Sequence, residues 1–445
     1  MKAKPAALRA PATPSFLLLT AMIAMFEGYD LSVYGTTVPS LLAMPSWHLS
    51  KGDAGDIGSL TALGMLIGAG IAGATGRRLG PRRLLLGGLT VFSACMIASG
   101  AAAGPSSFAA SRFLAGVGLG VVLPTLTAVV ADMVPAGRRS RAIAVVMAAS
   151  CLGSLSAPLL GSRLLPDTSF RVLYFVGAAA LVTVVPWAAL RLPDSPLHLL
   201  RTGRPEEATR VAERFGLPEP RLPADVPRDR LLGLAPLFAR GLALTTVLLW
   251  STAFCGLLLT FAFGTWLPTI MQTGGFSTSS ALTLTCLSWI GASAGLIPGG
   301  VLADRLGPRR VVAGAFLAGA GGLLVISLAP AKWLLYPSLM VCGLGLLGVQ
   351  AFVNAFVVER MPAELRTSAT GWALSVGRLG AIVGPSLGGR ILESGLDLKW
   401  SFYIFAAIGA LGALAAACVP RTGGGRPQRR AGVPAAVVLR PDSVA

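Results

Sequence analysis

Residues 60–83 read LTALGMLIGAGIAGATGRRLGPRR, and residues 287–310 read LSWIGASAGLIPGGVLADRLGPRR. The two stretches align without a gap at an offset of 227 residues, and ten positions are identical, among them the closing RLGPRR. Self-similarity at a fixed spacing indicates that a chain contains two copies of one structural unit. The same offset pairs residues elsewhere in the chain: Asp132 with Glu359, Arg139 with Arg366, Pro158 with Pro385 and Gly161 with Gly388.

The composition is that of an integral membrane protein. Of the 445 residues, 54% are hydrophobic and 13% are charged, and the mean hydropathy is +0.72. A helix that crosses a bilayer needs roughly 20 mainly apolar residues. We therefore predict an all-α membrane protein with two pseudo-symmetric halves of six transmembrane helices each, around a central cavity. The predicted spans are 16–44, 54–76, 83–103, 106–131, 141–165, 170–190, 241–271, 279–302, 310–329, 334–358, 367–392 and 400–419.

The basic residues report the orientation of the chain in the membrane. A net charge of +18 would suggest nucleic acid as the partner of a soluble protein. Here the cations gather in alternate loops, such as Arg82 and Arg83 after the second span and Arg309 and Arg310 after the eighth. Such a bias marks the cytoplasmic loops. We expect a multi-pass protein of the inner or plasma membrane with both termini inside, a monomer in the lipid bilayer, with no nucleic-acid partner.

Composition also divides the chain. The apolar run after the basic N-terminus continues to Met44 and carries acids, so it is a first span and not a signal peptide. The loop between the halves mixes charges with prolines, and we expect a short amphipathic helix near 205–215, on the membrane surface or bridging the halves. The expected segments are a cytoplasmic segment 1–15, a first half 16–190, a cytoplasmic linker 191–240, a second half 241–420 and a basic, disordered tail 421–445.

Four charges inside predicted spans do not recur between the halves. An ionised side chain at mid-bilayer costs about 2.5 to 3.5 kcal/mol on insertion scales, so it is normally retained for a task. A residue needed only by the scaffold should appear in both copies. These four do not: Glu27 aligns with Gly256, Asp30 with Leu259, Arg112 with Leu339 and Arg378 with Cys151.

These charges suit proton and anion binding. Glu27, Asp30 and Tyr34 share one helical face, which we expect to line an aqueous path. A carboxylate in a partly dry cavity exchanges a proton nearer neutral pH than in water, so the two acids are the proton-coupling candidates. Arginine keeps its charge, and its planar fork binds a carboxylate, so Arg378 and Arg112 are the substrate-anion candidates. The alternative is that the arginines serve only as ion-pair partners of the acids, although such pairs often add no net stability.

Further side chains extend the candidate site. Gln350 and Asn354, four residues apart, can bind a polar ring substituent or make a contact between helices. Trp266 and Trp289 can stack on a planar ligand or pack in the core. Charges at the cytoplasmic ends of the spans are expected to hold the loops and gate the inner face: Asp132, Glu359, Asp304, Arg305, Arg78, Arg139 and Arg366.

Several classes of protein lack support in the sequence. None of the five lysines follows a glycine, so a Gly-Lys-Ser/Thr phosphate loop is absent and an ion or substrate gradient, not ATP, is the expected driving force. The six cysteines stand singly in apolar segments and the two histidines lie far apart, which gives no metal or cofactor set. No nucleophile with a base is apparent, so we expect no enzyme.

Three segments resemble known transporters. GGVLADRLGPRR, 299–310, is similar to the hallmark loop of the major facilitator superfamily, although Arg77 stands in the first copy where that loop usually has an aspartate, present here as Asp304. FEGYDLSVYGTTVPSLL, 26–42, and VGRLGAIVGP, 376–385, resemble the aromatic acid:proton symporter family, whose first span carries Asp-Gly-x-Asp; Arg112 before its glycine stripe also matches. The resemblance implies the major facilitator fold and inward co-transport of benzoate or a hydroxybenzoate with protons.

Two other functions stay open at this point. One is a facilitator for a non-aromatic organic acid, or a proton-coupled drug exporter, although a cationic drug would leave Arg378 without a purpose. The other is a membrane receptor that binds its ligand without transport. A receptor of this kind is expected to carry a signalling domain, and neither the linker of about 50 residues nor the tail is long enough for a typical one.

Overall fold

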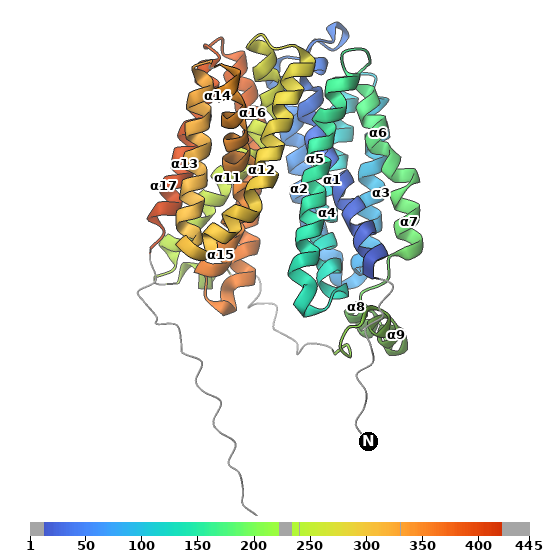
Figure 1. The fold of residues 1–445 in the computed structure, drawn as a ribbon. Helices are drawn as coiled ribbons and strands as arrows, with labels where there is room; N and C mark the ends of the chain where they lie inside the picture. Colours follow the sequence, from blue (N-terminus) through green and yellow to red (C-terminus); the bar gives the residue numbers. More distant parts are fainter. Residues whose placement is uncertain (1–12, 222–233, 240, 330, 421–445) are drawn as a thin grey trace, which may run out of the picture.

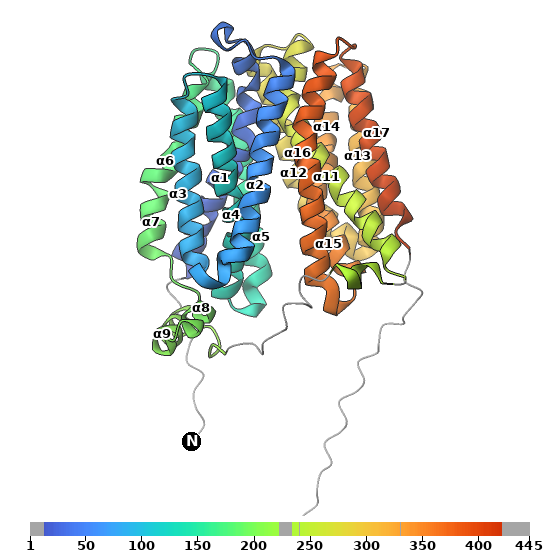
Figure 2. The same cartoon turned by 180° about the vertical axis from the view of Figure 1, so that it is seen from behind.

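The computed structural model describes residues 13–221, 234–239, 241–329 and 331–420, and within these ranges it contains helices and no strand. Two helical bundles stand side by side (Figure 1, and from behind in Figure 2). The prediction of an all-α membrane protein in two halves is confirmed. The predicted segments 1–15 and 421–445 lie wholly or mostly outside the described residues.

The first bundle contains six spans in the predicted places. The sixth is interrupted at Thr183, so that α6 and α7 follow one another along a single span. A short 3-10 turn, Pro45–Trp47, follows the first span. The helices are α1 (Thr13–Leu42), α2 (Lys51–Leu79), α3 (Pro81–Gly100), α4 (Pro105–Met133), α5 (Ala136–Leu164), α6 (Arg171–Val182) and α7 (Val184–Arg191).

The second bundle repeats this plan. Its fourth span is broken by a π-helical segment, Gly343–Leu347, between α14 and α15. Eleven helical segments among the described residues are long and apolar enough to cross a membrane, and α16, which carries Arg378, is the predicted span outside that set. The helices are α11 (Ala243–Thr273), α12 (Thr278–Leu306), α13 (Pro308–Ser327), α14 (Lys332–Cys342), α15 (Val349–Arg360), α16 (Arg366–Glu393) and α17 (Lys399–Cys418).

The repeated RLGPRR sequence forms the same turn in both bundles. Gly80 and Gly307 have φ values of 80° and 84°, in a region that favours glycine. Pro81 and Pro308 follow as the first residues of the next helices, where the missing amide hydrogen costs nothing. The sequence therefore recurs because each copy must turn tightly between its second and third spans.

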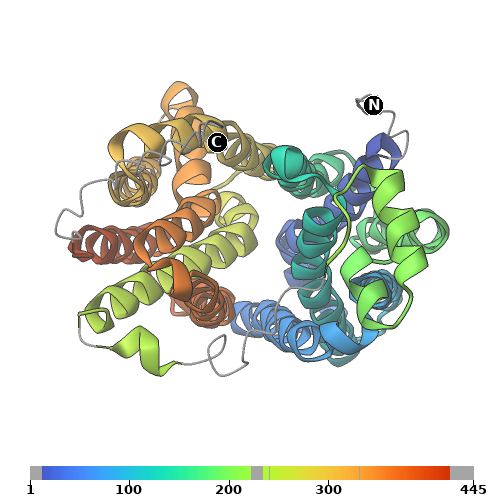
Figure 3. The same ribbon diagram turned by 90° about the horizontal axis from the view of Figure 1, so that it is seen from below.

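The described residues of the linker form two short helices, α8 (Pro196–Arg201) and α9 (Pro205–Phe215), and the 3-10 turn Ala235–Phe238. The predicted helix at 205–215 is confirmed. It does not bridge the halves, because α8 and α9 lie under the first bundle, as Figure 3 shows from below. The Phe215 ring packs edge-on against Phe16 of α1, with 5.5 Å between centroids. We call this end of the molecule the linker end and the opposite one the far end.

The halves hold together toward the far end and diverge toward the linker end (Figures 1 and 2). Their main seam joins the first turns of α2 to the last turns of α16. Lys51 Nζ donates to the Leu392 carbonyl at 3.2 Å, and Ser386 Oγ donates to Asp56 Oδ1 at 2.5 Å. The molecule is therefore closed between its halves at the far end.

Candidate functional site

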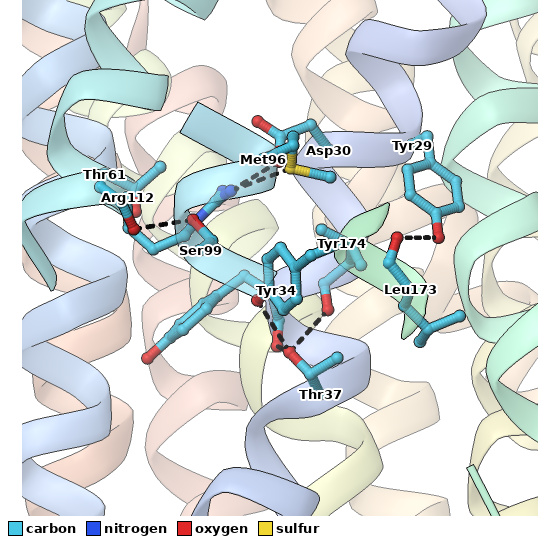
Figure 4. Close-up of polar contacts among 12 residues, drawn as sticks. Tyr29, Asp30, Tyr34, Thr37, Thr61, Met96, Ser99, Arg112, Leu173 and Tyr174 are labelled. Carbon is cyan, nitrogen blue, oxygen red and sulfur yellow. Dashed lines mark hydrogen bonds and ion pairs between the residues drawn. The ribbon is translucent and has the colours of Figure 1, made fainter. Parts of the chain in front are cut away.

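A fully buried ion pair occupies the middle of the first bundle (Figure 4). Arg112 Nη1 on α4 donates to Asp30 Oδ1 on α1 at 2.6 Å, and the two side chains are 1% and 0% exposed. Met96 Sδ lies 3.6 Å from the same nitrogen, and the guanidinium carbon lies 5.8 Å from the centre of the Tyr174 ring. Asp30 Oδ2 and Arg112 Nε are buried without a hydrogen-bond partner among the described residues. The pair is therefore only partly satisfied.

Hydroxyl groups tie α1 to its neighbours beside this pair. Tyr174 and Thr37 share a hydrogen bond of 2.9 Å, and the Tyr29 hydroxyl donates to the Leu173 carbonyl at 2.7 Å (Figure 4). The Tyr34 hydroxyl donates to the Ala54 carbonyl of α2, and its side chain is buried. These contacts hold the helix that carries the acids.

Glu27 points to a different helix from Asp30. Its Oε2 accepts a hydrogen bond of 2.8 Å from Ser150 on α5, while Oε1 is buried and has no hydrogen-bond partner in the part of the chain that the structure describes. A Cβ on Gly28 would collide with the Ser150 carbonyl oxygen, so glycine is what lets α1 and α5 approach this closely. The prediction that Glu27, Asp30 and Tyr34 line one open path is wrong in this conformation. Positions i and i+3 share a helix face but differ by about 60° around its axis, and here that difference directs Glu27 to α5 and Asp30 to α4.

Arg378 lies at the boundary between the halves. Its half-buried guanidinium donates from Nη1 to the Met65 carbonyl of α2 at 2.8 Å. No ion pair within 4 Å joins Arg378 to an acid in the described part of the chain. Glu27 and Arg378 each lie near the middle of their helices, α1 and α16.

The polar pair of the second half lies in α15. Gln350 Nε2 donates to Asn354 Oδ1 at 3.1 Å; Gln350 is half-buried and Asn354 exposed. A Cβ on Gly256, which aligns with Glu27, would come 2.8 Å from Gln350 Oε1. Trp289 is half-buried. Trp266 is fully buried and donates from Nε1 to the Pro385 carbonyl at 2.8 Å, so its ring has no surface for a ligand in this conformation.

The predicted cytoplasmic charges lie at the linker end but do not form a network in this conformation. Asp132 accepts a hydrogen bond of 2.7 Å from Ser195 of the linker, a contact that the sequence did not indicate. Arg366 Nε donates to the Met361 carbonyl at 3.2 Å. Among the described residues, no ion pair joins any two of the seven. The halves diverge at this end, and the side chains of Arg78, Arg139, Asp304, Arg305, Glu359 and Arg366 are exposed.

Two repeated six-span bundles with unmatched charges at their boundary define a membrane transporter. The sequence model of the Major Facilitator Superfamily matches residues 20–293 and 278–441, and the chain belongs to that family. Family and relatives are membrane transporters and not enzymes, in agreement with the sequence.

The similar proteins are named as transporters of aromatic acids, in agreement with the resemblance to the aromatic acid:proton symporter family. The chain is 32% identical to the gallate transporter of Pseudomonas putida over 87% of each chain. It is 33% identical to the gentisate transporter of Corynebacterium glutamicum, over 90% of this chain and 86% of the relative. It is 29% identical to the benzoate transport protein of Acinetobacter baylyi, over 89% and 87%. The crystal structure of D-xylose-proton symporter shares the fold with a TM-score of 0.72, at 18% identity over 91% of this chain and 97% of that one.

Proposed function

We propose that the protein is a secondary active transporter that imports a small aromatic carboxylate, of the benzoate or hydroxybenzoate type, together with protons. The proposal is supported by the aromatic acids named for its relatives and by the geometry at the boundary of the halves. The carrying observation is Arg378, a guanidinium that has no counterpart in the first half and whose hydrogen bond to Met65 bridges the two bundles. The Lys/Arg bias supports a plasma-membrane location with both termini inside, and we take the monomer as the transporting unit.

Arg378 is the proposed anchor for the substrate carboxylate. Its one recorded hydrogen bond goes to a neutral carbonyl, at Met65, which an anion can replace. A carboxylate takes two parallel hydrogen bonds from a guanidinium, and such charge-assisted bonds are stronger than a bond to a neutral acceptor. Arg112 differs because Asp30 already holds it. Arg112 can reach a substrate only after that pair opens.

Glu27 and Asp30 are the proposed proton carriers. Glu27 keeps a buried oxygen without a donor, and protonation removes the charge that this site leaves unsatisfied. Protonation of Asp30 would release Arg112. Import of a monoanion against an inside-negative potential costs about 2.3 kcal/mol per 100 mV, so one proton makes transport electroneutral and two make the potential favourable.

Alternating access supplies the movement. In the conformation described, α2 and α16 close the far end through Asp56, Ser386 and Lys51, while the linker end is parted. The opposite state requires this seam to open and the charges at the linker end to meet. The separated residues Asp132, Glu359 and Asp304, with their arginines, are the proposed contacts of that second state.

The test is uptake into vesicles that contain the purified protein. A panel of labelled benzoate, hydroxybenzoates and aliphatic acids is measured with and without an inward proton gradient. We expect accumulation of the aromatic acids that depends on the gradient. Preference for aliphatic acids would favour an organic-acid facilitator, and proton-driven export of cationic drugs would favour an exporter. Benzoate binding without uptake or counterflow would favour a receptor.

A further inference from the structure

A pocket at the linker end of the second half gathers positive charge. It encloses about 520 Å³ and lies where α12 turns into α13, beside the ends of α15 and α17. Three arginines and one glutamate line it, so its formal charge is 3 − 1 = +2. The charged residues are Arg309, Arg310, Arg360 and Glu359, and the apolar wall includes Leu306, Ala313 and Phe356.

The matching place in the first half is filled by the chain itself. Asp194 of the linker lies 3.7 Å from Arg82, the residue that aligns with Arg309. The ring of His198 covers Gly80, where an added Cβ would come within 2.5 Å of Nε2. Ser195 donates to Asp132, which aligns with Glu359. An intramolecular carboxylate therefore meets the arginine of this loop in the first copy.

The scaffold around the two places is otherwise alike. Arg82 donates to the Ala189 carbonyl near the end of α7, and Arg309 donates to the Ala417 carbonyl near the end of α17. The sequences that follow differ in charge. After α7 the chain brings Asp194, whereas residues 421–430, RTGGGRPQRR, contain four arginines and no acid. Among the described residues, no ion pair joins Arg309 to an acid, so the arginine that aligns with Arg82 has no intramolecular counterpart of Asp194 there.

We propose that this pocket binds the phosphate of an anionic phospholipid headgroup. Arginine forks suit phosphate oxygens, and basic pockets beside membrane spans are typical sites for anionic lipid headgroups. Leu306, Pro308, Arg360 and Ala417 stand at or next to the ends of four helical segments that are long and apolar enough to cross a membrane. This places the arginines at headgroup depth, with apolar wall residues on the membrane side for the acyl chains.

Native mass spectrometry of the full chain, carried in phosphatidylglycerol and then in phosphatidylcholine, tests the proposal. Arg310→Ala removes an exposed arginine, and Arg360→Met installs the residue that the first half has at this position, Met133. Arg83→Ala is the matched control, because Arg83 aligns with Arg310 and is also exposed. We expect each pocket variant to retain about fivefold less phosphatidylglycerol than wild type. The control should match wild type, and phosphatidylcholine should be lost from all proteins.

Three results would overturn the proposal. Equal loss of phosphatidylglycerol in Arg83→Ala would show general surface attraction in place of a pocket. Equal retention of phosphatidylcholine would show no preference for an anion. Displacement of the lipid by millimolar inorganic phosphate, with binding of that phosphate lost in Arg310→Ala, would make soluble phosphate the ligand. Monodisperse elution of every variant in detergent serves as the check on folding.

Discussion

The two halves share one scaffold but fill its centre with different chemistry. In the first half, Asp30 and Arg112 form a buried ion pair. The aligned positions of the second half are Leu259 and Leu339, both 0% exposed. The scaffold therefore packs a pair of leucines where the other copy has two charges, and the ion pair is not required by the fold. Its retention in one copy indicates a function.

The second half shows the reverse asymmetry. Arg378 aligns with Cys151, Gln350 with Leu123 and Asn354 with Thr127, so polar groups appear where the first half has apolar or small ones. The two acids within the spans, Glu27 and Asp30, belong to the first half. Arg378, which forms no ion pair in the described part of the chain, belongs to the second half. Under the proposed function, the first half supplies the proton-carrying acids and the second half supplies the anchor for the anion.

Replacement of Arg378 is expected to have the largest effect. Arg378→Ala should abolish uptake of labelled benzoate while the protein still inserts, because Arg378 forms no ion pair with an acid among the described residues and is the proposed anchor for the carboxylate. Arg378→Lys should restore only a small fraction, since one ammonium cannot make two parallel bonds to a carboxylate. Uptake into vesicles with equal amounts of protein measures both. Arg210→Ala, which changes an exposed residue of the linker helix α9, is the control, and near-normal uptake by Arg378→Ala would remove the anchor.

Neutralisation of Asp30 should separate exchange from accumulation. Asp30→Asn keeps the shape but cannot carry a proton, so accumulation driven by an inward proton gradient should fall to the level of equilibration. Counterflow of labelled against unlabelled benzoate should persist. Wild-type uptake should rise as external pH falls, and the variant should respond far less. A variant that still accumulates substrate would exclude Asp30 as a coupling residue.

Conversion of the first half to the chemistry of the second tests what the ion pair contributes to stability. Arg112→Leu leaves the Asp30 carboxylate buried alone and should destabilise the protein by about 3 to 5 kcal/mol. The double variant Asp30→Leu with Arg112→Leu reproduces the pair found at Leu259 and Leu339, and should recover most of that loss. Thermal unfolding in detergent compares the three proteins.

The same double variant should be inactive in proton-driven uptake despite its recovered stability. This combination distinguishes a functional pair from a structural one. A double variant as unstable as Arg112→Leu would mean that the first half has come to depend on its charges. A double variant with normal uptake would mean that the pair takes no part in coupling.

The sequence predicted the scaffold well because the repeat and the hydropathy pattern depend on local and periodic features. The predicted spans and the helix at 205–215 follow from these. The contacts of Glu27 and Asp30 could not be predicted from such features, because the direction of a side chain depends on which neighbouring helix approaches it. Nothing in the sequence identified Ser150 as the partner of Glu27, apart from the fact that it aligns with a different residue, Gly377, in the second half.

Two other expectations depended on conformation. The linker-end charges were expected to meet, but helix ends that belong to separate bundles come together only when the bundles close there. Trp266 was a candidate for stacking on a ligand because aromatic residues within spans serve either role. Its indole hydrogen bond to Pro385 places it in the seam between α11 and α16.

The smallest expected effect concerns the polar pair of the second half. Gln350→Leu installs the residue that aligns with it, Leu123, and removes one hydrogen-bonding group without adding charge. If this side chain binds a ring hydroxyl, the KM for a hydroxybenzoate should rise about fivefold, the effect of one hydrogen bond of roughly 1 kcal/mol. The KM for benzoate should stay unchanged. Because the two substrates share the carboxylate, their ratio isolates the ring contact from the Arg378 anchor, and an equal rise for both would assign Gln350 to helix packing.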